Sequence, residues 1–284
     1  MMENKEELRN FIIYCLNEDV GDGDHSSLAC INPDTPGKAK LLIKEEGILA
    51  GVRVAGLVFS EVDKSLRIET LIHDGAKVIS GDIAFFVVGN RLSILKAERL
   101  VLNIMQRMSG IATSTNEYVV RLRGLNTKIL DTRKTTPGMR ALEKEAVRLG
   151  GGQNHRMGLY DMIMLKDNHI DFAGGIKPAI ERTHEYLKKK GLDLRIEIEA
   201  RNLGDVAEIV AFGGIDRIML DNFSIEDTLS AVRIINRRFE TESSGGITLK
   251  NIRDYAECGV DFVSVGAITH HLKSLDMSLK AVSE

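Results

Sequence analysis

The chain has 284 residues, of which 43% are hydrophobic and 28% are charged, a composition typical of a folded protein rather than a disordered one. Its formal net charge of −3 argues against nucleic-acid binding, which needs a basic excess, but small anionic ligands require only a local cluster of cations. The three cysteines are widely spaced, which indicates a reducing compartment and neither a disulfide nor a zinc framework. With no apolar signal segment and no uncharged apolar run of ~20 residues, we expect a cytoplasmic protein without a membrane span.

The first part of the chain mixes helical and strand patterns. Apolar residues recur on one helical face from Leu8 to Leu16, which predicts a helix that ends at the glycine–aspartate loop 20–24. A second, longer helical pattern has apolar residues four apart from Leu100 to Ala112. We therefore expect an N-terminal α+β domain over residues 1–112. Its strand-like runs are 38–44, 66–72 and 83–88.

The remainder of the chain alternates short apolar runs with amphipathic stretches, a βα rhythm that predicts a parallel sheet with helices outside it. A full eight-stranded barrel takes about 250 residues, and only ~160 remain here. We therefore expect an incomplete TIM-like α/β barrel over residues 113–270, with a C-terminal tail, 271–284, that can pack back on the first domain. The predicted strands are 128–131, 161–166, 195–199, 216–221 and 261–266, with a weaker one at 239–242.

Polar residues or glycine stand at the end of five of these strands. They are Asp131, Lys166, Glu199, Asp221 and Gly266. One such residue would mean only that the strand exits into a polar loop. Five in series indicate a functional site, because α/β barrels place their chemistry at the carboxyl ends of their strands.

Cations are concentrated between residues 131 and 169. Arg133 and Lys134 occupy a threonine-rich loop, and three glycines, 150–152, precede His155 and Arg156. Lys166 then ends the next strand. Arginine suits carboxylate or phosphate through its planar fork, and glycines let the backbone approach a ligand closely. In a protein of negative net charge, this cluster predicts an anion-binding site.

Two acids, Glu199 and Asp221, end consecutive predicted strands and should therefore face one cleft. Such a pair can hold ribose hydroxyls, coordinate Mg²⁺ or stabilise a developing positive charge, and it can also form salt bridges to the nearby cations. Glu197 lies two residues earlier and points to the same face of its strand. It can share this role or fill a layer of the barrel.

Small residues follow the last two predicted strands. Gly245 and Gly246 come after Ser244, and Ala267 comes after Gly266. Such loops expose backbone N–H groups to a phosphate, and late βα loops are the usual phosphate site of these barrels. We therefore expect the phosphate of a ligand to bind here.

Long motifs across nearly the whole chain closely resemble the quinolinate phosphoribosyltransferase family. The resemblance implies conversion of quinolinate and phosphoribosyl pyrophosphate to nicotinate mononucleotide, pyrophosphate and carbon dioxide, in de novo NAD biosynthesis. It is carried by residues 18–24, 97–103, 109–113, 131–138, 150–169, 220–222, 242–246 and 266–270.

The resemblance also implies roles for individual residues. The enzyme would be a homodimer, with Arg99 reaching the partner's site and Mg²⁺ accompanying the pyrophosphate. Lys134, Lys166, Glu199 and Asp221 are the expected catalytic residues. Quinolinate would bind to Arg133, His155, Arg156 and Lys166. The phosphoribosyl pyrophosphate side would be formed by Lys134, Glu199, Asp221, Ser244, Gly245, Gly246, Gly266 and His270. Thr132 and Ala267 are further expected substrate-binding residues.

Three alternatives remain open. The first is a paralogue of the same fold, such as the molybdenum-locus relative or a nicotinate phosphoribosyltransferase, although a monocarboxylate acceptor should need fewer cations. The second is a Schiff-base aldolase that uses Lys166, although the polar residues that follow it do not favour a low lysine pKa. The third is a non-catalytic binder of a phosphorylated ligand, which would not need both acids and the full set of cations.

Overall fold

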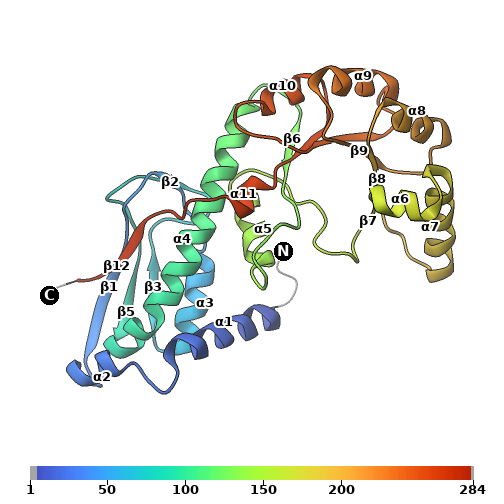
Figure 1. Cartoon of the computed structure of the whole chain (residues 1–284). Coiled ribbons are helices and arrows are strands. Elements are labelled where there is room, and N and C mark those ends of the chain that lie inside the picture. The colour runs from blue at the N-terminus through green and yellow to red at the C-terminus, as the bar shows by residue number, and fades with distance from the viewer. Residues whose placement is uncertain (1–4, 283–284) are drawn as a thin grey trace. The chain divides into compact units, whose positions relative to one another are not determined.

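The structure is a computed structural model that describes residues 5–282. It consists of two compact units (Figure 1). The first unit runs to Asn116 and also includes Thr136–Gly151 and the chain from His271 onward. The second unit comprises Glu117–Thr135 and Gly152–His270. Within residues 5–282, no helix combines the length and the apolar character needed to cross a membrane.

The first unit contains a four-stranded antiparallel sheet with the strand order β12-β1-β5-β3, together with a two-stranded ribbon of β2 and β4. Its strands are β1 (Pro36–Ile43), β2 (Gly47–Ile48), β3 (Arg67–Thr70), β4 (Lys77–Val78), β5 (Ile83–Asn90) and β12 (Met277–Ala281). Its helices are α1 (Lys5–Val20), α2 (His25–Cys30), α3 (Val52–Val62), α4 (Arg91–Arg121), which continues into the second unit, and α5 (Arg140–Leu149).

Apolar side chains of the sheet and of α3 form the core of the first unit. Leu41 and Val87 are fully buried on the central strands β1 and β5, and Phe59 of α3 meets Phe85 of β5 edge to face, with ring centroids 6.0 Å apart. The strand β12 pairs antiparallel with β1 along its whole length. The C-terminal segment therefore supplies an edge strand to the sheet that the N-terminal segment begins.

The second unit is built on a six-stranded parallel sheet with the order β6-β11-β10-β9-β8-β7. The last strand of the sheet in sequence, β11, pairs with the first, β6, as in a closed barrel. The sheet ends at β6 on one side and at β7 on the other, so the barrel stays open between these two strands. One parallel bridge, Leu130 to Gln153, extends the sheet beyond β6. The strands are β6 (Lys128–Leu130), β7 (Ile163–Leu165), β8 (Ile196–Ala200), β9 (Arg217–Asp221), β10 (Glu240–Ser244) and β11 (Phe262–Ser264).

Helices connect these strands and lie outside the sheet (Figure 1). Along this series α7 contacts α8, α8 contacts α9 and α9 contacts α10. The fold is therefore an incomplete α/β barrel, as the sequence predicted. The helices are α6 (Asp167–Ala173), α7 (Ile176–Lys190), α8 (Leu203–Phe212), α9 (Ile225–Ile235), α10 (Ile252–Glu257) and α11 (Ala267–His270).

The division of the chain differs from the expected boundaries at two places. The expected boundary between residues 112 and 113 falls inside α4, and the structure divides the units after Asn116 instead. The segment Thr136–Gly151, expected in the barrel, groups with the first unit. Within that unit, Arg107 of α4 bonds to both Glu143 and Thr136, at 2.7 Å in each case, which ties the segment to α4.

Candidate active site

The inner face of the barrel strands is polar. In β8, Glu197 and Glu199 alternate with apolar residues, and in β9 Arg217 and Asp221 lie four apart on one face. Glu197 stands opposite Arg217 in the register of these two strands. Successive side chains of a strand point to opposite faces, so the apolar set can pack outward while the charged set lines the interior.

At the carboxyl ends of β7, β8 and β9, a lysine lies beside two acids. The Lys166 Nζ donates to Glu199 Oε1 at 2.8 Å, and the backbone N–H of Asp167 donates to the other oxygen of Glu199 at 3.3 Å. Lys166 is about half exposed, whereas Glu199 is buried. Burial, and then the neighbouring charge of Glu199, raise the pKa of Asp221. These three residues, each predicted from a strand end, lie within one electrostatic cluster.

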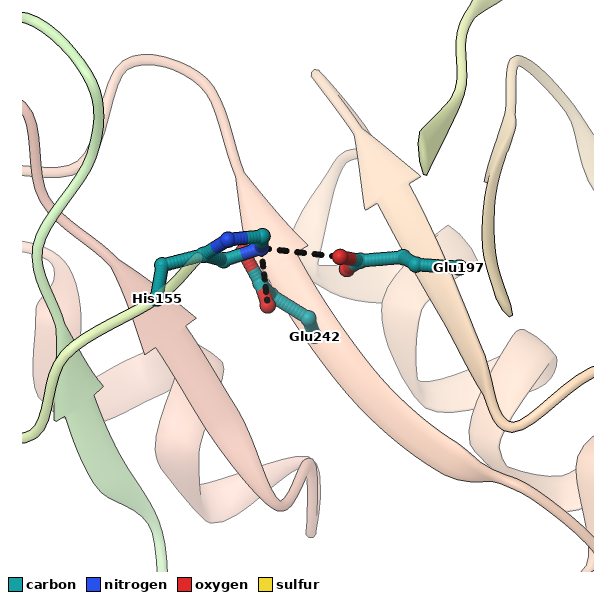
Figure 2. A group of neighbouring side chains, drawn as sticks. All are labelled: His155, Glu197 and Glu242. Atoms are coloured by element: carbon teal, nitrogen blue, oxygen red, sulfur yellow. Dashed lines mark ion pairs between the residues drawn. The ribbon is translucent and has the colours of Figure 1, made fainter. Parts of the chain in front are cut away.

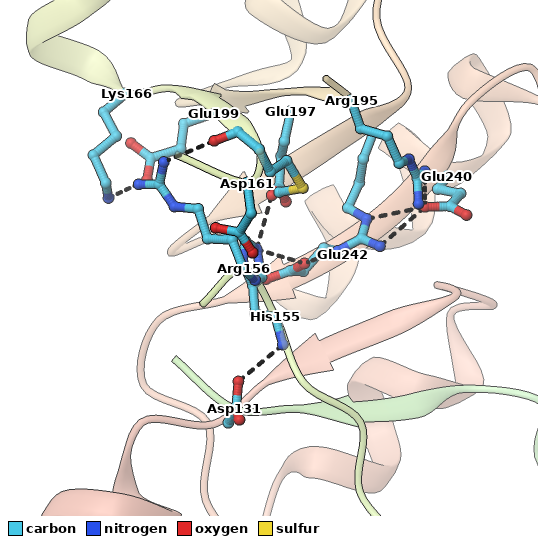
Figure 3. A network of polar contacts seen from close by, with 12 residues as sticks. Asp131, His155, Arg156, Asp161, Lys166, Arg195, Glu197, Glu199, Glu240 and Glu242 are labelled. Carbon is cyan, nitrogen blue, oxygen red and sulfur yellow. Dashed lines mark hydrogen bonds and ion pairs between the residues drawn. The ribbon is translucent and has the colours of Figure 1, made fainter. Parts of the chain in front are cut away.

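The loop before β7 supplies Arg156 to the same region. Its Nη1 donates to the carbonyl of Met162 at 3.2 Å, and Figure 3 shows its side chain beside Lys166 and Glu199. Burial, and then the charge of Arg133, lower the pKa of Arg156. The positive charges of Arg133 and Arg156 repel each other, so the arrangement favours an anion that binds near both side chains.

Asp131 fixes the start of this loop. It is fully buried at the end of β6 and accepts hydrogen bonds from the Asn154 side chain at 2.6 Å and the backbone N–H of His155 at 2.8 Å. Charged acceptors make the stronger hydrogen bonds of proteins. The carboxylate therefore anchors the polypeptide from which His155 and Arg156 project.

The ring of His155 turns into the interior of the barrel. It does not point to the rim of the site, formed by Lys166, Glu199 and Asp221 at the carboxyl ends of the strands. Its ring is 6% exposed, and its Nε2 lies 2.8 Å from Glu197 and 3.6 Å from Glu242, both fully buried (Figure 2). Glu242 also accepts from Arg217 at 2.9 Å. Burial raises the pKa of Glu197 to about 7 and that of Glu242 to about 8. The predicted contact of His155 with quinolinate stays a prediction, because here the ring faces the interior of the barrel.

The two glycine loops predicted to bind phosphate are closely packed against neighbouring loops. Gly245 has a φ of +92°, and a Cβ there would collide with the side chain of Asn222. At Gly266 a Cβ would lie 3.0 Å from His270 and 3.2 Å from Lys134. Within residues 5–282, the backbone N–H groups of Gly245, Gly246 and Gly266 have no hydrogen-bond partner in the chain. These donors are therefore available to an anion.

The remaining predicted residues divide between the two units. Thr132 accepts from the backbone N–H of Lys134 at 3.1 Å, which shapes their loop, and Arg133 is exposed. Ser244 ends β10 and Ala267 begins α11, so both flank the glycine loops. Arg99 lies on α4 in the first unit, where it is exposed.

Family models match the chain in two successive parts. The model for the C-terminal domain of quinolinate phosphoribosyl transferase matches residues 111–280, and the model for the N-terminal domain matches residues 24–109. The chain belongs to the quinolinate phosphoribosyltransferase family. Membership of this family accounts for the order of the strand-end motifs along the chain.

Similar proteins come from plants and bacteria. A chloroplastic nicotinate-nucleotide pyrophosphorylase [carboxylating] of Arabidopsis thaliana is 45% identical over 98% of this chain and 84% of its own length. A mitochondrial quinolinate phosphoribosyltransferase [decarboxylating] 2a of Nicotiana tabacum is 43% identical over 98% of the chain and 83% of its own length. The crystal structure of NadC from Streptococcus pyogenes superposes with a TM-score of 0.92 at 38% identity, covering 98% of each chain.

The structure also bears on the aldolase alternative. A Schiff-base lysine must be available as a neutral amine, which desolvation or a neighbouring cation promotes. In this member of the quinolinate phosphoribosyltransferase family, Lys166 is hydrogen-bonded to a carboxylate and about half exposed. A lysine that pairs with an acid at the mouth of the barrel, beside another cation (Figure 3), suits the binding of an anion better than amine chemistry.

Sequence reasoning missed the partners that lie beneath the rim. Glu242 appeared only as part of a motif, and Arg217 was not singled out. The signal was present in the strand sequences, since IEIEA and ETESS place acids at alternate positions of buried strands. Charged residues are rarely fully buried unless they are paired, so this pattern predicts buried ion pairs inside the barrel.

Proposed function

We propose that this protein transfers the phosphoribosyl group of phosphoribosyl pyrophosphate to quinolinate, with release of pyrophosphate and carbon dioxide, in NAD biosynthesis. The observation that carries the proposal is the cluster of Arg156, Lys166, Glu199 and Asp221 at the carboxyl ends of the barrel strands. Family membership supports it, because relatives 43–45% identical over 98% of the chain bear names that describe this reaction.

The cations are proposed to bind quinolinate. Arg133, Arg156 and Lys166 would hold its two carboxylates. His155 would either line the same binding surface or support it from the interior of the barrel. Holding the acceptor on both carboxylates aims its ring nitrogen at the anomeric carbon, which removes much of the entropic barrier of a two-substrate reaction.

The acids and the glycine loops are proposed to bind phosphoribosyl pyrophosphate. Glu199 and Asp221 would hold the ribose and stabilise the positive charge that develops as the bond to pyrophosphate breaks. Lys134 would offset the charge of the leaving group. The free backbone N–H groups near the ends of β10 and β11 would receive phosphate oxygens. This side of the site would comprise Thr132, Lys134, Glu199, Asp221, Ser244, Gly245, Gly246, Gly266, Ala267 and His270.

Decarboxylation then follows from the charge that the first step creates. When the ring nitrogen forms its bond to ribose it becomes cationic. Loss of the adjacent carboxylate as carbon dioxide leaves its electron pair on the ring carbon, as a carbanion that the neighbouring positive nitrogen stabilises. A proton from water then adds to that carbon and gives nicotinate mononucleotide. The residues of the chain need only hold the intermediate in place during this step, so no organic cofactor is required.

Mg²⁺ is the proposed metal, and the available donors fit it. Carboxylate oxygens are the ligands that Mg²⁺ prefers. The raised pKa of Asp221 reflects burial and then repulsion by Glu199, and a cation would relieve that repulsion. Glu199 and Asp221 would hold the ion together with the pyrophosphate oxygens, whose charge it would neutralise.

A turnover assay tests the proposal. With quinolinate, phosphoribosyl pyrophosphate and Mg²⁺, we expect equimolar carbon dioxide and nicotinate mononucleotide, and we expect EDTA to abolish turnover until Mg²⁺ is restored. Consumption of nicotinate in place of quinolinate would assign a sister activity. Tight ligand binding without turnover with either acceptor would indicate a non-catalytic binder.

We further propose a cytoplasmic homodimer in which Arg99 of each protomer completes the partner's site. Arg99 is exposed and lines a pocket of the first unit with Asn103 and Arg107, so it is free to meet another chain. Light scattering should give the mass of two chains. Localisation in the cytoplasm can be checked by fractionation, since plant relatives carry chloroplastic and mitochondrial names.

Mixed dimers give a sharper prediction. Arg99→Ala and Lys166→Ala homodimers should each be inactive, because every site lacks one cation. A dimer of one chain of each, isolated with two affinity tags, would combine both defects in one site and leave the other site intact. It should regain about half of the wild-type activity, since a two-fold dimer has two equivalent sites. An inactive mixed dimer would show that Arg99 acts within its own chain.

A further inference from the structure

Behind the cations at the carboxyl ends of the strands lie Glu197, Glu242 and Arg217, to which the proposed reaction assigns no part, packed around His155. The His155 ring, 6% exposed, lies between Glu197 and Glu242, whose side chains are fully buried (Figure 2). Arg217, at the start of β9, joins Glu242 to Glu240, at the start of β10. Polar groups removed from water persist only when they satisfy one another, so this arrangement needs an explanation.

The distances indicate direct contact between the side chains rather than a metal site. One histidine and two carboxylates are familiar zinc ligands, but two ligands on a tetrahedral ion, each about 2.0–2.1 Å from it, lie roughly 3.3 Å apart. The Nε2 of His155 and Oε2 of Glu197 are only 2.8 Å apart. The oxygen of Glu242 nearest His155 already accepts from Arg217, a fixed cation that would repel a metal ion.

The hydrogen bonds of the ring determine its tautomer. The backbone N–H of Arg156 lies 2.7 Å from His155 Nδ1. A backbone N–H can only donate, so Nδ1 must be the acceptor and the ring proton must be on Nε2. Nε2, which then carries the proton, lies 2.8 Å from Glu197 Oε2 as an ion-pair contact. The ring is therefore a neutral imidazole that accepts at Nδ1 and carries its proton on Nε2, on the side of the two acids.

Both the backbone and the ring of residue 155 are in contact with fixed groups. The backbone N–H donates to Asp131 at 2.8 Å, Nδ1 accepts from the N–H of Arg156, and Nε2 lies in ion-pair contact with Glu197. Glu242 lies 3.6 Å from the same Nε2 and is fixed by Arg217. The backbone at Arg156 is thus fixed by a chain of hydrogen bonds and ion-pair contacts that runs through the interior of the barrel.

We propose that Glu197 and Glu242 are positioning residues, which hold His155 as the Nε2–H tautomer and thereby fix Arg156 for binding of the acceptor carboxylate. The proposal rests on the proposed function, because it assigns Arg156 to quinolinate. A cation displaced by about 1 Å can cost a hundredfold in rate when the geometry of attack depends on it. The two acids thus act through His155 and Arg156 without touching substrate.

Two variants of Glu197 test this inference. Glu197→Gln keeps a carbonyl oxygen that can accept from Nε2–H, whereas Glu197→Leu is of similar size and offers no acceptor. For the leucine variant we expect KM for quinolinate to rise about tenfold, with KM for phosphoribosyl pyrophosphate changed less than about twofold. The glutamine variant should remain close to wild type. Circular dichroism and thermal melting confirm that each variant is folded.

A spectroscopic measurement tests the tautomer without any substrate. Nitrogen-15 NMR of the wild-type histidine rings, with His155→Asn for assignment, should show Nδ1 without a proton and Nε2 with one. A proton on Nδ1 overturns the inference. So does a folded leucine variant with unchanged KM for quinolinate, or a glutamine variant as impaired as the leucine variant. If wild type does not turn over quinolinate, the proposed function fails, and the NMR result still decides the tautomer separately.

Discussion

Replacement of Lys166 by alanine should lower kcat/KM for quinolinate by about a thousandfold, similar to the loss of an important electrostatic group in other enzymes. The Nζ lies 2.8 Å from Glu199 at the carboxyl end of the barrel, where the substrates are proposed to meet. The side chain is about half exposed, and an exposed ion pair contributes at most about 1 kcal/mol to stability. Steady-state kinetics and circular dichroism should therefore show lost activity with a retained fold.

Lys177 provides a matched control. It pairs with Glu181 one turn along α7, at 3.9 Å, and both side chains are more than half exposed. Lys177→Ala removes the same charge from another lysine–glutamate pair of the barrel unit, away from the strand ends. It should leave both turnover and unfolding unchanged. Near-normal turnover of Lys166→Ala, or loss of its fold, would contradict the assigned role.

The rim of the site could be predicted from the sequence because strand ends are visible there. Each apolar run of the barrel stops at a residue such as Lys166, Glu199 or Asp221, and parallel strands bring those ends to one side. The fold class followed from the same alternation of strands and helices. Neither inference required knowledge of how side chains pair, because both depend only on strand direction and chain order.

The interior could not be predicted in the same way. His155 follows three glycines in a loop, and nothing local to the sequence shows that its ring turns inward to Glu197 and Glu242. Those two acids are 45 residues apart in the numbering of the chain and come close only because β8 and β10 flank β9 in the sheet. The placement of Thr136–Gly151 in the first unit likewise depends on long-range bonds to Arg107. Pairings of this kind are properties of the assembled fold.

Replacement of Arg217 by methionine should destabilise the protein in a way that grows with pH. The guanidinium is 9% exposed and bonds to Glu242 at 2.9 Å, so the variant keeps the apolar stem and removes the cation beside the buried acids. Removing one partner of a buried ion pair costs about 3–5 kcal/mol. We expect a loss of this size near pH 8.5 and a much smaller loss near pH 5.5, measured as the free energy of unfolding in urea.

The increase of this loss of stability with pH follows from the carboxyl groups of Glu197 and Glu242. Burial raises the pKa of Glu197 to about 7 and that of Glu242 to about 8, from the ordinary glutamate value of 4.5. Acids whose pKa is raised by folding contribute stability that is fully present below the unfolded value and is lost as pH rises through the folded values. In wild type, Arg217 limits this loss by stabilising the ionised forms. Without Arg217, ionisation costs more, so the difference between variant and wild type widens across this pH range.

Arg195→Met is the matched control, because Arg195 pairs with the same Glu240 as Arg217 but is half exposed. Its loss should cost at most about 1 kcal/mol and should depend little on pH, since solvent screens the pair. An Arg217→Met variant whose loss of stability stayed constant from pH 5.5 to 8.5 would show that the buried acids do not ionise in this range. The barrel interior would then carry its acids as a neutral hydrogen-bonded layer, and the stabilising effect of Arg217 would come from its packing over the Phe262 ring, 4.1 Å away.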